Sequence, residues 1–459
     1  MGKTASGFLV GGRSMSGAVV GVSFYATFAS TNSYIGHAGK GYEYGLPWLT
    51  MAILLVVFAW LSWRFVAPRM RRVTAAWGSL TVPDFLAVRF ASEHVRLAAG
   101  VVIAFASILY LVAVFKGAGN LLQVFLGIPY RTAVLATLVL IVAYTSVGGF
   151  LSVVRTDVVQ GVLMLIGSVL LFVFITQAAG GVTAIKDVAT TTDTASLFEL
   201  NAGIPFIVLL GIAFAGSLKL LVDPRQVTRF YGLRDEASVR VGIWVAVGGI
   251  LVIQFCLFPI GLYAHLLLDG VNDTDLVVPT LVGSKDVFPT LVSDFLVIAI
   301  LAAAMSSLDS VLLVAASVTA RDIIGFRRAY REHPRIVQWT RLGVVAFALV
   351  AALVALDPPA GIVELTIFSG SLFAVCFVPT ILLGLHWRRG NAAAALAAFG
   401  IGVAVLFGWL AAGLADIVHE VFPALLASTT AYMVISVCGK AVADPQVLRA
   451  WEPTDGRLP

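Results

Sequence analysis

The sequence SFYATFASTNSYIGHAG, residues 23–39, decides the fold of this chain. It belongs to an otherwise apolar segment that begins near residue 16, yet it carries a run of hydroxyl and amide side chains followed by Gly36 and Gly39. Inside a bilayer, polar and glycine-rich backbone is tolerated only where it is buried in protein or lines a wet cavity. In transporters such a break exposes backbone groups that can hold an ion or a solute. A small-residue contact between membrane helices is the alternative interpretation.

Composition excludes an ordinary soluble protein. Of the 459 residues, 59% are hydrophobic and only 12% are charged, whereas soluble domains carry about 25% charged residues. We expect no cleavable signal peptide, because the first dozen residues lack an apolar core of the required length. The three cysteines and six histidines show no paired spacing, so neither a disulfide framework nor a zinc site is indicated. The sequence therefore predicts a protein whose main partner is the lipid bilayer.

Twelve apolar segments are long enough, at roughly 20 residues, to cross a hydrocarbon layer of about 30 Å. They are predicted at residues 16–37, 46–67, 97–126, 131–146, 150–178, 204–223, 238–267, 287–320, 338–356, 361–386, 391–413 and 420–439. The fold class is thus an all-α polytopic membrane protein with about 12 transmembrane helices. In the connection after the second span, TVPDFLAVRF at 81–90 predicts a short interfacial helix capped near Asp84.

The loop charges predict an orientation, because Lys and Arg are retained on the cytoplasmic side. The connections after spans two, six, eight and ten are rich in arginine, and the one after span six includes Arg225 and Arg229. The alternate connections carry mostly acidic residues, such as Asp187 and Asp273. We therefore expect a multi-pass protein of the plasma membrane with both termini of this chain in the cytoplasm. Because the basic residues set the orientation of the spans in the membrane, no nucleic-acid partner is expected.

Spans one and six both carry interruptions. In span six, Gly211, Gly216 and Lys219 precede an Asp-Pro pair at 223–224. Two interrupted segments five spans apart indicate inverted repeats with a binding site between them. The predicted organisation is a single transmembrane domain over 1–459, with a first inverted repeat at 16–178, a second at 204–386, two additional helices at 391–439 and a cytoplasmic tail at 440–459.

Six motifs follow one another along nearly the whole chain. They are GGRSMSG at 11–17, SFYATFASTNSYIG at 23–36, LTVPDFLAVRF at 80–90, YTSVGGFLSVVRTDVVQG at 144–161, AAAMSSLDSVLLVAASVTARDI at 302–323 and GLHWRRGNAAAALAAFGIG at 384–402. Together they resemble the sodium:solute symporters, a family that includes proline, pantothenate, sugar, sialic acid and monocarboxylate carriers. The resemblance implies a leucine-transporter-like fold with 5+5 inverted repeats and two C-terminal helices. Family members commonly carry a further helix before the GGRS motif, so we expect an N-terminally short member.

A first cation site is predicted from the eighth span, where three serines and Ala303 lie along one helical face. Sodium is a hard cation that prefers oxygen ligands. In the family, the corresponding helix gives one carbonyl and two hydroxyl groups to Na+, and the broken first helix gives two carbonyls. The resemblance therefore implies a sodium site formed by the carbonyl oxygens of Ala26, Ala29 and Ala303 and the hydroxyls of Ser306 and Ser307. The alternative is a packing seam of small residues.

A second cation site is predicted from Asp157, Asp309 and Ser310. At about 1.5 Å per residue, both acids lie at a comparable depth in the cytoplasmic half of their helices, and two buried carboxylates repel unless a cation lies between them. Family members that bind an additional sodium use the aspartate aligned with Asp157 and hydroxyls aligned with 309–310. The acid at 309 departs from that pattern and should strengthen cation binding or favour a proton. The alternative is a structural ion pair of Asp157 with Arg155 or Arg321.

The solute is expected near the membrane midplane, beside the breaks in spans one and six. The first break offers Ser30, Asn32 and Ser33, and Ser33 occupies the position at which sugar-carrying relatives place a polar substrate ligand. Lys116 and Lys219 are ionisable groups inside apolar spans, which makes both of them candidate substrate ligands. The alternatives are snorkelling of Lys116 toward the outer surface and an ion pair of Lys219 with the aspartate one turn further on.

These features predict a sodium-coupled symporter that imports a small organic solute by alternating access, with Na+ as the coupling ion. A small carboxylate is the leading class, because KGAG at 116–119 is similar to the VGAG motif of relatives that include monocarboxylate carriers. A neutral amino acid, sugar or vitamin is the alternative; Gly216 and Leu220 stand where proline carriers have aromatic residues. An enzyme is not indicated, since no catalytic motif is present. A transporter-like sensor ranks last, because the tail after Lys440 is too short to fold alone, and no obligate protein partner is inferred.

Overall fold

The computed structural model describes residues 5–145, 149–201, 203–327, 331, 333–442 and 447. Within these residues the regular elements are helices, apart from one isolated bridge between Met15 and Leu233. Ten helices of the described part are long and apolar enough to cross a membrane, and two shorter apolar helices occupy the places of the first and fourth predicted spans. All twelve predicted spans therefore correspond to helices, and the prediction of an all-α multi-pass membrane protein is confirmed.

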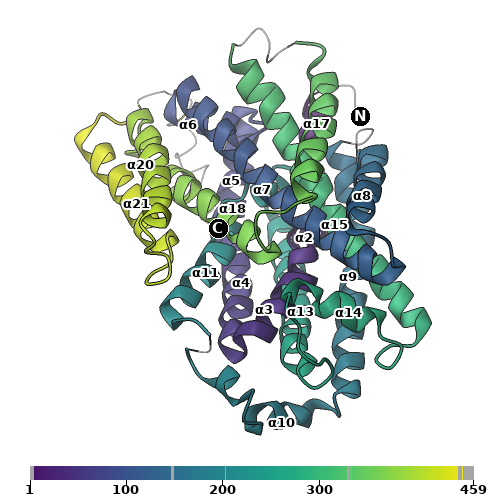
Figure 1. Cartoon of the computed structure of the whole chain (residues 1–459). Helices are drawn as coiled ribbons and strands as arrows, with labels where there is room; N and C mark the ends of the chain where they lie inside the picture. The colour runs from purple at the N-terminus through teal and green to yellow at the C-terminus, as the bar shows by residue number, and fades with distance from the viewer. Residues whose placement is uncertain are drawn as a thin grey trace.

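In chain order, the spans are formed by α2 (Gly17–Phe28) with α3 (His37–Tyr44), α4 (Leu49–Leu61) with α5 (Ala67–Trp77), α7 (Glu93–Leu126), α8 (Tyr130–Thr145), α9 (Phe150–Ala178), α11 (Phe206–Leu218) with α12 (Pro224–Tyr231), α13 (Glu236–Ala264), α15 (Thr290–Val318), α17 (Ile336–Ala355), α18 (Ile362–Phe377), α20 (Ala392–Ala411) and α21 (Val421–Cys438). The short helices outside them are α1 (Ala5–Val10), α6 (Val82–Phe90), α10 (Ile185–Thr190), α14 (Val277–Gly283) and α19 (Gly384–His386). Figure 1 shows α6 at one end of the bundle, α10 at the other, and α20 beside α21 at its edge.

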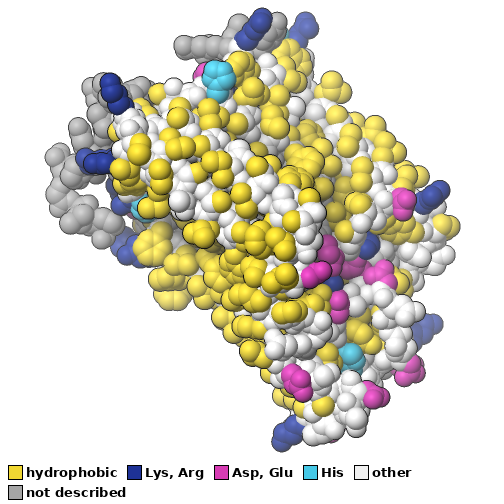
Figure 2. Space-filling view, turned by 60° about the vertical axis from the view of Figure 1, so that its left-hand side comes forward, with side chains coloured by type: hydrophobic (Ala, Val, Ile, Leu, Met, Phe, Trp, Pro, Cys, Tyr) yellow, Lys and Arg dark blue, Asp and Glu magenta, His cyan; other side chains and the backbone are white. Residues whose placement is uncertain are grey.

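The outside of the bundle is apolar, as contact with lipid requires. Large apolar side chains stand out from several helices, among them Trp244 at 80% and Leu291 at 81% of full exposure. Figure 2 shows hydrophobic side chains over much of this face, with Lys and Arg side chains at its upper end and a group of acidic side chains at the lower right. On the predicted orientation, which stays a prediction, the end with α6 is cytoplasmic and the end with α10 is outer.

The first span is interrupted, as its polar run predicts. α2 ends at Phe28, because the backbone of Ala29 is extended (φ −67°, ψ 117°). The chain then returns to helical geometry through a π-helical turn at Asn32–Gly36 and continues into α3. The hydroxyl of Ser30 accepts a hydrogen bond of 3.1 Å from the amide of Asn32, which stabilises the turn. The last carbonyls of α2 are therefore left without partners inside their own helix.

The sixth span is also interrupted, but later than its glycines predict. α11 runs through Gly211 and Gly216 to Leu218, and the helix is lost only at Val222 and Asp223. The two glycines provide space instead: a Cβ atom on Gly211 would lie 2.2 Å from His419 Cβ. The break itself arises at Asp223, whose carboxylate caps α12 by accepting a hydrogen bond of 2.9 Å from the amide of Arg225.

Two of the arginines after the sixth span, Arg225 and Arg229, do not lie in a loop, and the loop-charge prediction is wrong for these two. α12 buries Arg225 and Arg229, which are 4% and 2% exposed. Arg89 is buried as well, and its guanidinium donates to the carbonyl oxygens of Gly384, Trp387 and Gly390. The carboxylates of Asp223 and Asp157 offset the buried charges of Arg225 and Arg229, and backbone carbonyls engage the donors of Arg89.

The predicted interfacial helix is present as α6, with Thr81 as its N-cap. The Thr81 hydroxyl donates a 2.8 Å hydrogen bond to Asp322 in the π-helical turn that follows α15. Asp84 pairs with Arg321 at 3.0 Å and with Arg96 of α7. Although burial alone would raise it, the pKa of Asp84 is held below its ordinary value by the charges of Arg321 and Arg96. This cluster ties α6, α7 and the end of α15 together at the end of the bundle that carries α6.

Most of the predicted tail at 440–459, and residues 146–148 of the fourth motif, lie outside the described residues. The relation of 16–178 to 204–386 as inverted repeats stays a prediction.

Candidate ion and substrate site

The first predicted cation site is assembled from the end of α2 and the middle of α15. The Ser306 hydroxyl donates a hydrogen bond of 2.8 Å to the carbonyl oxygen of Ala26 and lies 3.3 Å from that of Ala303. The Ser307 hydroxyl lies 3.4 Å from the carbonyl oxygen of Ala29. All five residues are fully buried. The structure thus brings together every oxygen that the resemblance implies as a sodium ligand.

These oxygens suit a hard cation, which prefers carbonyl and hydroxyl ligands to nitrogen or sulfur. The carbonyls of Ala26 and Ala29 are available because α2 is broken immediately after them. A serine hydroxyl rotates freely between donating and accepting, so Ser306 and Ser307 can present lone pairs to a cation in place of their bonds to α2. The carbonyl oxygen of Thr27, 3.3 Å from the Ser307 hydroxyl, joins this set and is absent from the sequence-based assignment.

The second predicted set is partly assembled, and an arginine lies within it. The Nη2 atom of Arg229 is 3.1 Å from Oδ2 of Asp157 on α9 and also donates to the hydroxyl of Ser310 on α15. Asp309 accepts a hydrogen bond from Thr145 of α8. Among the described residues, Asp157 therefore pairs with Arg229, and the alternative prediction of a pair with Arg155 or Arg321 is wrong, since Arg321 pairs with Asp84.

At the first break, two of the three predicted substrate ligands are engaged locally. The Ser30 hydroxyl accepts from the Asn32 amide, and the Ser33 hydroxyl lies 3.5 Å from the Ser30 amide nitrogen. The side chain of Asn32 instead contacts His37, with 3.2 Å between Nδ2 and Nε2. His37 in turn lies 3.1 Å from Oε1 of Gln254 on α13.

Asn32 Oδ1 and Gln254 Nε2 are buried and have no hydrogen-bond partner among the described residues. Buried polar atoms without a partner cost about 1–3 kcal/mol each, and a solute or water that bonds to them would remove this cost. Sequence reasoning missed His37 and Gln254. The signal that indicates them is a polar or ionisable side chain inside an apolar span, the same signal that selected the two lysines.

Lys219 lies at the second break, where the 3-10 turn Lys219–Leu221 leaves α11. It is only 4% exposed, and its ammonium nitrogen lies 5.6 Å from the centre of the Tyr110 ring of α7. The alternative ion pair with Asp223 does not form, because Asp223 binds Arg225 with an Nη2–Oδ2 distance of 2.5 Å. Within the described part of the chain, the Lys219 side chain has no hydrogen bond or ion pair, and the carboxylate of nearby Asp223 is bound by Arg225.

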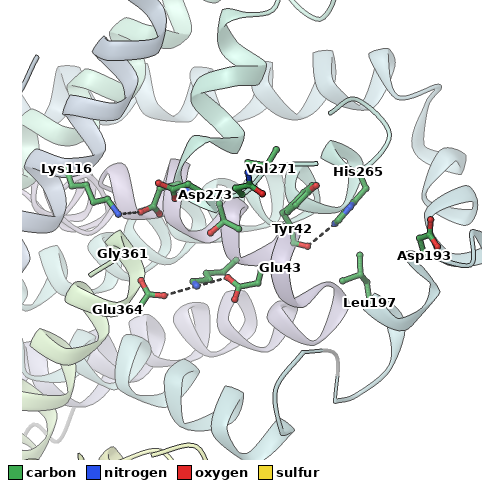
Figure 3. Close-up of a pocket in the computed structure, with 14 residues that line it drawn as sticks. Tyr42, Glu43, Lys116, Asp193, Leu197, His265, Val271, Asp273, Gly361 and Glu364 are labelled. Atoms are coloured by element: carbon green, nitrogen blue, oxygen red, sulfur yellow. Dashed lines mark hydrogen bonds and ion pairs between the residues drawn. The ribbon is translucent and has the colours of Figure 1, made fainter. Parts of the chain in front are cut away.

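Lys116 does not join Lys219. Its ammonium lies 2.7 Å from Oδ2 of Asp275, in the short helical turn before α14, and it points into a cavity of about 640 Å³ (Figure 3). We call it the outer cavity, after the predicted orientation. Lys116 and Tyr110 are six residues apart on α7, which separates them by roughly 9 Å along the helix axis. Lys116 therefore forms an ion pair with Asp275 and does not extend freely toward the membrane surface, as the snorkelling alternative predicted.

The same outer cavity holds a second ion pair cluster. Lys40 of α3 lies 2.6 Å from Glu43 and 2.7 Å from Glu364 at the start of α18, and in Figure 3 both glutamates point toward the same ammonium. Five carboxylates and two lysines line the cavity in total. The outer mouth of the protein therefore carries an excess of negative charge.

A membrane bundle with two broken helices around a buried, oxygen-rich site is the architecture of a secondary transporter. The sequence model of the sodium:solute symporter family matches residues 8–402, and this chain belongs to that family. The osmoregulated proline transporter OpuE of Bacillus subtilis (strain 168) is 30% identical over 95% of this chain and 90% of its own length. The sodium/pantothenate symporter of Escherichia coli (strain K12) is 29% identical over 96% of this chain and 92% of its own length.

Solved structures show the same fold. A Na+-coupled sialic acid symporter in a substrate-bound outward-open state superposes with a TM-score of 0.80 at 20% identity, over 96% of this chain and 93% of its own. Mhp1, a nucleobase-cation-symport-1 family transporter in a closed conformation, superposes with a TM-score of 0.60 at 13% identity, over 96% of this chain and 97% of its own. The predicted family, fold class and non-enzymatic transporter function are thus confirmed, and sodium-coupled symport of a small solute is supported.

Proposed function

We propose that this protein is a sodium-coupled symporter that imports a small organic carboxylate. The observation that carries the solute class is Lys219, a buried amine beside the second helix break that forms no ion pair among the described residues, because Asp223 binds Arg225. A buried charge without a partner is unfavourable. A solute carboxylate would provide the missing counter-charge, so solute binding and charge neutralisation coincide at this position.

The relatives support the same class. Their names specify proline and pantothenate as solutes, and both of these molecules carry a carboxylate. In the proposed site Lys219 binds the carboxylate, while Ser30, Asn32 and Ser33 at the first break bind the rest of the solute with His37 and Gln254. Lys116, which points into the outer cavity, is assigned to the access path.

Sodium coupling follows from the position of the first cation site between two structural units. A cation held by carbonyls at the end of α2 and by hydroxyls of α15 would join the broken helix to α15. Ion binding therefore stabilises the arrangement in which the first break is closed against α15, and the solute site beside that break is completed at the same time. A ligand shifts a conformational equilibrium by as much as its affinities for the two states differ.

A neutral or zwitterionic solute is the second candidate, and the acidic outer cavity favours it. A mouth with five carboxylates and two lysines attracts cations and repels free anions. A zwitterionic amino acid would pass this mouth without repulsion and still present a carboxylate to Lys219, whereas a sugar would leave Lys219 unpaired.

Uptake into proteoliposomes tests the proposal. Labelled small monocarboxylates, zwitterionic amino acids, pantothenate and neutral sugars are compared with and without an inward sodium gradient. We expect sodium-dependent uptake of at least one carboxylate-bearing solute. Uptake restricted to neutral sugars contradicts the solute class, uptake that ignores sodium contradicts the coupling, and binding without any uptake indicates a sensor.

A further inference from the structure

The guanidinium of Arg229 lies where the second exchangeable cation was predicted. Its Nη2 atom is 3.1 Å from Asp157 Oδ2 and 2.8 Å from the Thr27 hydroxyl, and it donates to the hydroxyl of Ser310. Its Nε atom lies 3.2 Å from the same Thr27 oxygen. One carboxylate and two hydroxyls from three different helices thus converge on a single positive group.

This pocket is sealed from solvent. Asp157 and Thr27 are fully buried, and Arg229 and Ser310 are each 2% exposed. The carboxylate needs a positive partner there, because an isolated buried charge is strongly unfavourable. Arg229 supplies that charge, and the hydroxyl of Ser23 adds a 2.6 Å hydrogen bond to the same carboxylate oxygen. A free cation beside the guanidinium would place two positive charges against the one carboxylate of Asp157, where they repel each other, since Asp309 is held by Thr145 of α8 instead.

Building on the proposed sodium-coupled symport, we propose that Arg229 is the resident cation of the site formed by Asp157, Thr27 and Ser310, so that the protein binds a single exchangeable Na+. Two of the three residues predicted for the second site, Asp157 and Ser310, are therefore occupied by the chain itself, whereas Asp309 accepts from Thr145. A free cation enters it only when the guanidinium is removed.

Thr27 links the guanidinium of Arg229 to the first sodium site. Its hydroxyl accepts from Arg229, while its carbonyl oxygen lies 3.3 Å from the Ser307 hydroxyl. Ser310 provides a second link, since its hydroxyl donates to the Ser306 carbonyl oxygen at 2.8 Å. Arg229 belongs to α12, the helix that follows the second break. Movement of α12 would therefore shift a positive charge directly beside the first site.

The test counts sodium ions bound to the purified full-length protein by equilibrium binding of radioactive Na+, without solute. An alkaline buffer is used, so that a proton does not neutralise a carboxylate released by mutation. We expect a single bound ion in the wild type and in Arg229→Lys, which keeps the charge. We expect a second ion in Arg229→Ala, and its loss again in the double variant Arg229→Ala, Asp157→Asn, which removes the freed carboxylate.

Two bound ions in the wild type overturn the assignment without any variant, so it stays testable even if Arg229→Ala fails to fold. A single ion in a folded Arg229→Ala, unchanged by the added Asp157→Asn, also overturns it. Absence of any bound sodium in the wild type overturns the proposed sodium coupling itself, which separates that failure from the failure of the Arg229 assignment.

Discussion

The hydroxyl of Ser306 on α15 donates a hydrogen bond of 2.8 Å to the carbonyl oxygen of Ala26 at the end of α2, across 280 positions of sequence. The bond exists because α2 stops at Phe28 and leaves that carbonyl without a helical partner. The same two oxygens belong to the proposed sodium site, so the contact that closes the bundle here is also the contact that a cation would replace.

Replacing both Ser306 and Ser307 by alanine should weaken sodium binding, because two of the five oxygen ligands are removed. We expect the sodium concentration for half-maximal uptake to rise about tenfold or more, which corresponds to roughly 1.4 kcal/mol. Ser317→Ala is the matched control, since this serine lies on the same helix and donates only to the Val314 carbonyl oxygen at 3.0 Å. An unchanged sodium requirement in the double variant would show that the assignment is wrong.

Lys219→Met should abolish uptake of the carboxylate-bearing solute while sodium binding persists, because the ammonium is removed and the α2–α15 oxygens are untouched. Lys116→Met is the control: its ammonium pairs with Asp275 in the outer cavity, so we expect slower uptake with the same solute preference. Two quantities are measured for each variant: the uptake of labelled solute and the binding of radioactive Na+. Equal loss of transport in both variants, with sodium binding intact, would contradict a separate role for Lys219.

Gln254→Leu should raise the KM for the solute about tenfold or more, because a site built to hydrogen-bond a ligand loses one of its polar groups. Its Oε1 atom also holds His37 at 3.1 Å, so the ring loses its orientation. We expect the sodium dependence of uptake to stay unchanged. Gln177→Leu, an exposed amide near the end of α9, serves as the control. A KM equal to that of the wild type would exclude Gln254 from the solute site.

Asp84→Asn should destabilise the protein by about 1–3 kcal/mol, because Arg321 would lose its carboxylate while Arg96 keeps Asp322 and Glu93. The pKa of Asp84 is lowered in the folded protein. Its contribution is therefore fully present above the ordinary carboxyl pKa of 3.8 and is lost as the pH falls through the lowered value.

Thermal unfolding in detergent measures this effect. The melting temperature of the wild type should fall on acidification below the ordinary carboxyl pKa, and that of Asp84→Asn should depend less on pH in the same range. The control is Asp235→Asn at the N-cap of α13, a half-exposed carboxylate that accepts a hydrogen bond from the Ser238 amide. If both variants melt alike, the buried cluster does not stabilise the cytoplasmic end.

The orientation can be tested with single cysteines in a background without Cys438, which is exposed. Asp187→Cys on α10 should react with a membrane-impermeant maleimide in intact cells. Arg335→Cys, before α17, should react only after permeabilisation, because arginine-rich connections stay in the cytoplasm. The reverse pattern would invert the assignment of the two ends.

Sequence alone determined the features that depend on neighbouring residues. Hydropathy predicted every span, since the length of an apolar segment needed to cross a bilayer is a local property. The polar run after Tyr25 predicted the break in the first span, and the spacing of Ser306 and Ser307 predicted a face of hydroxyls on α15. The carbonyl ligands at Ala26 and Ala29 required the family resemblance in addition, because backbone oxygens carry no signature of their own in a sequence.

The tertiary structure decided which charges are paired. Arg229 was counted as a loop charge, yet α12 packs it against Asp157, a residue far away in the chain. Lys116 and Lys219 gave the same signal, but packing pairs the first with Asp275, whereas Asp223 near the second is bound by Arg225. The reason is physical: hydropathy reports whether a residue leaves water, whereas the cost of burying its charge depends on which partner the fold brings within a few ångströms.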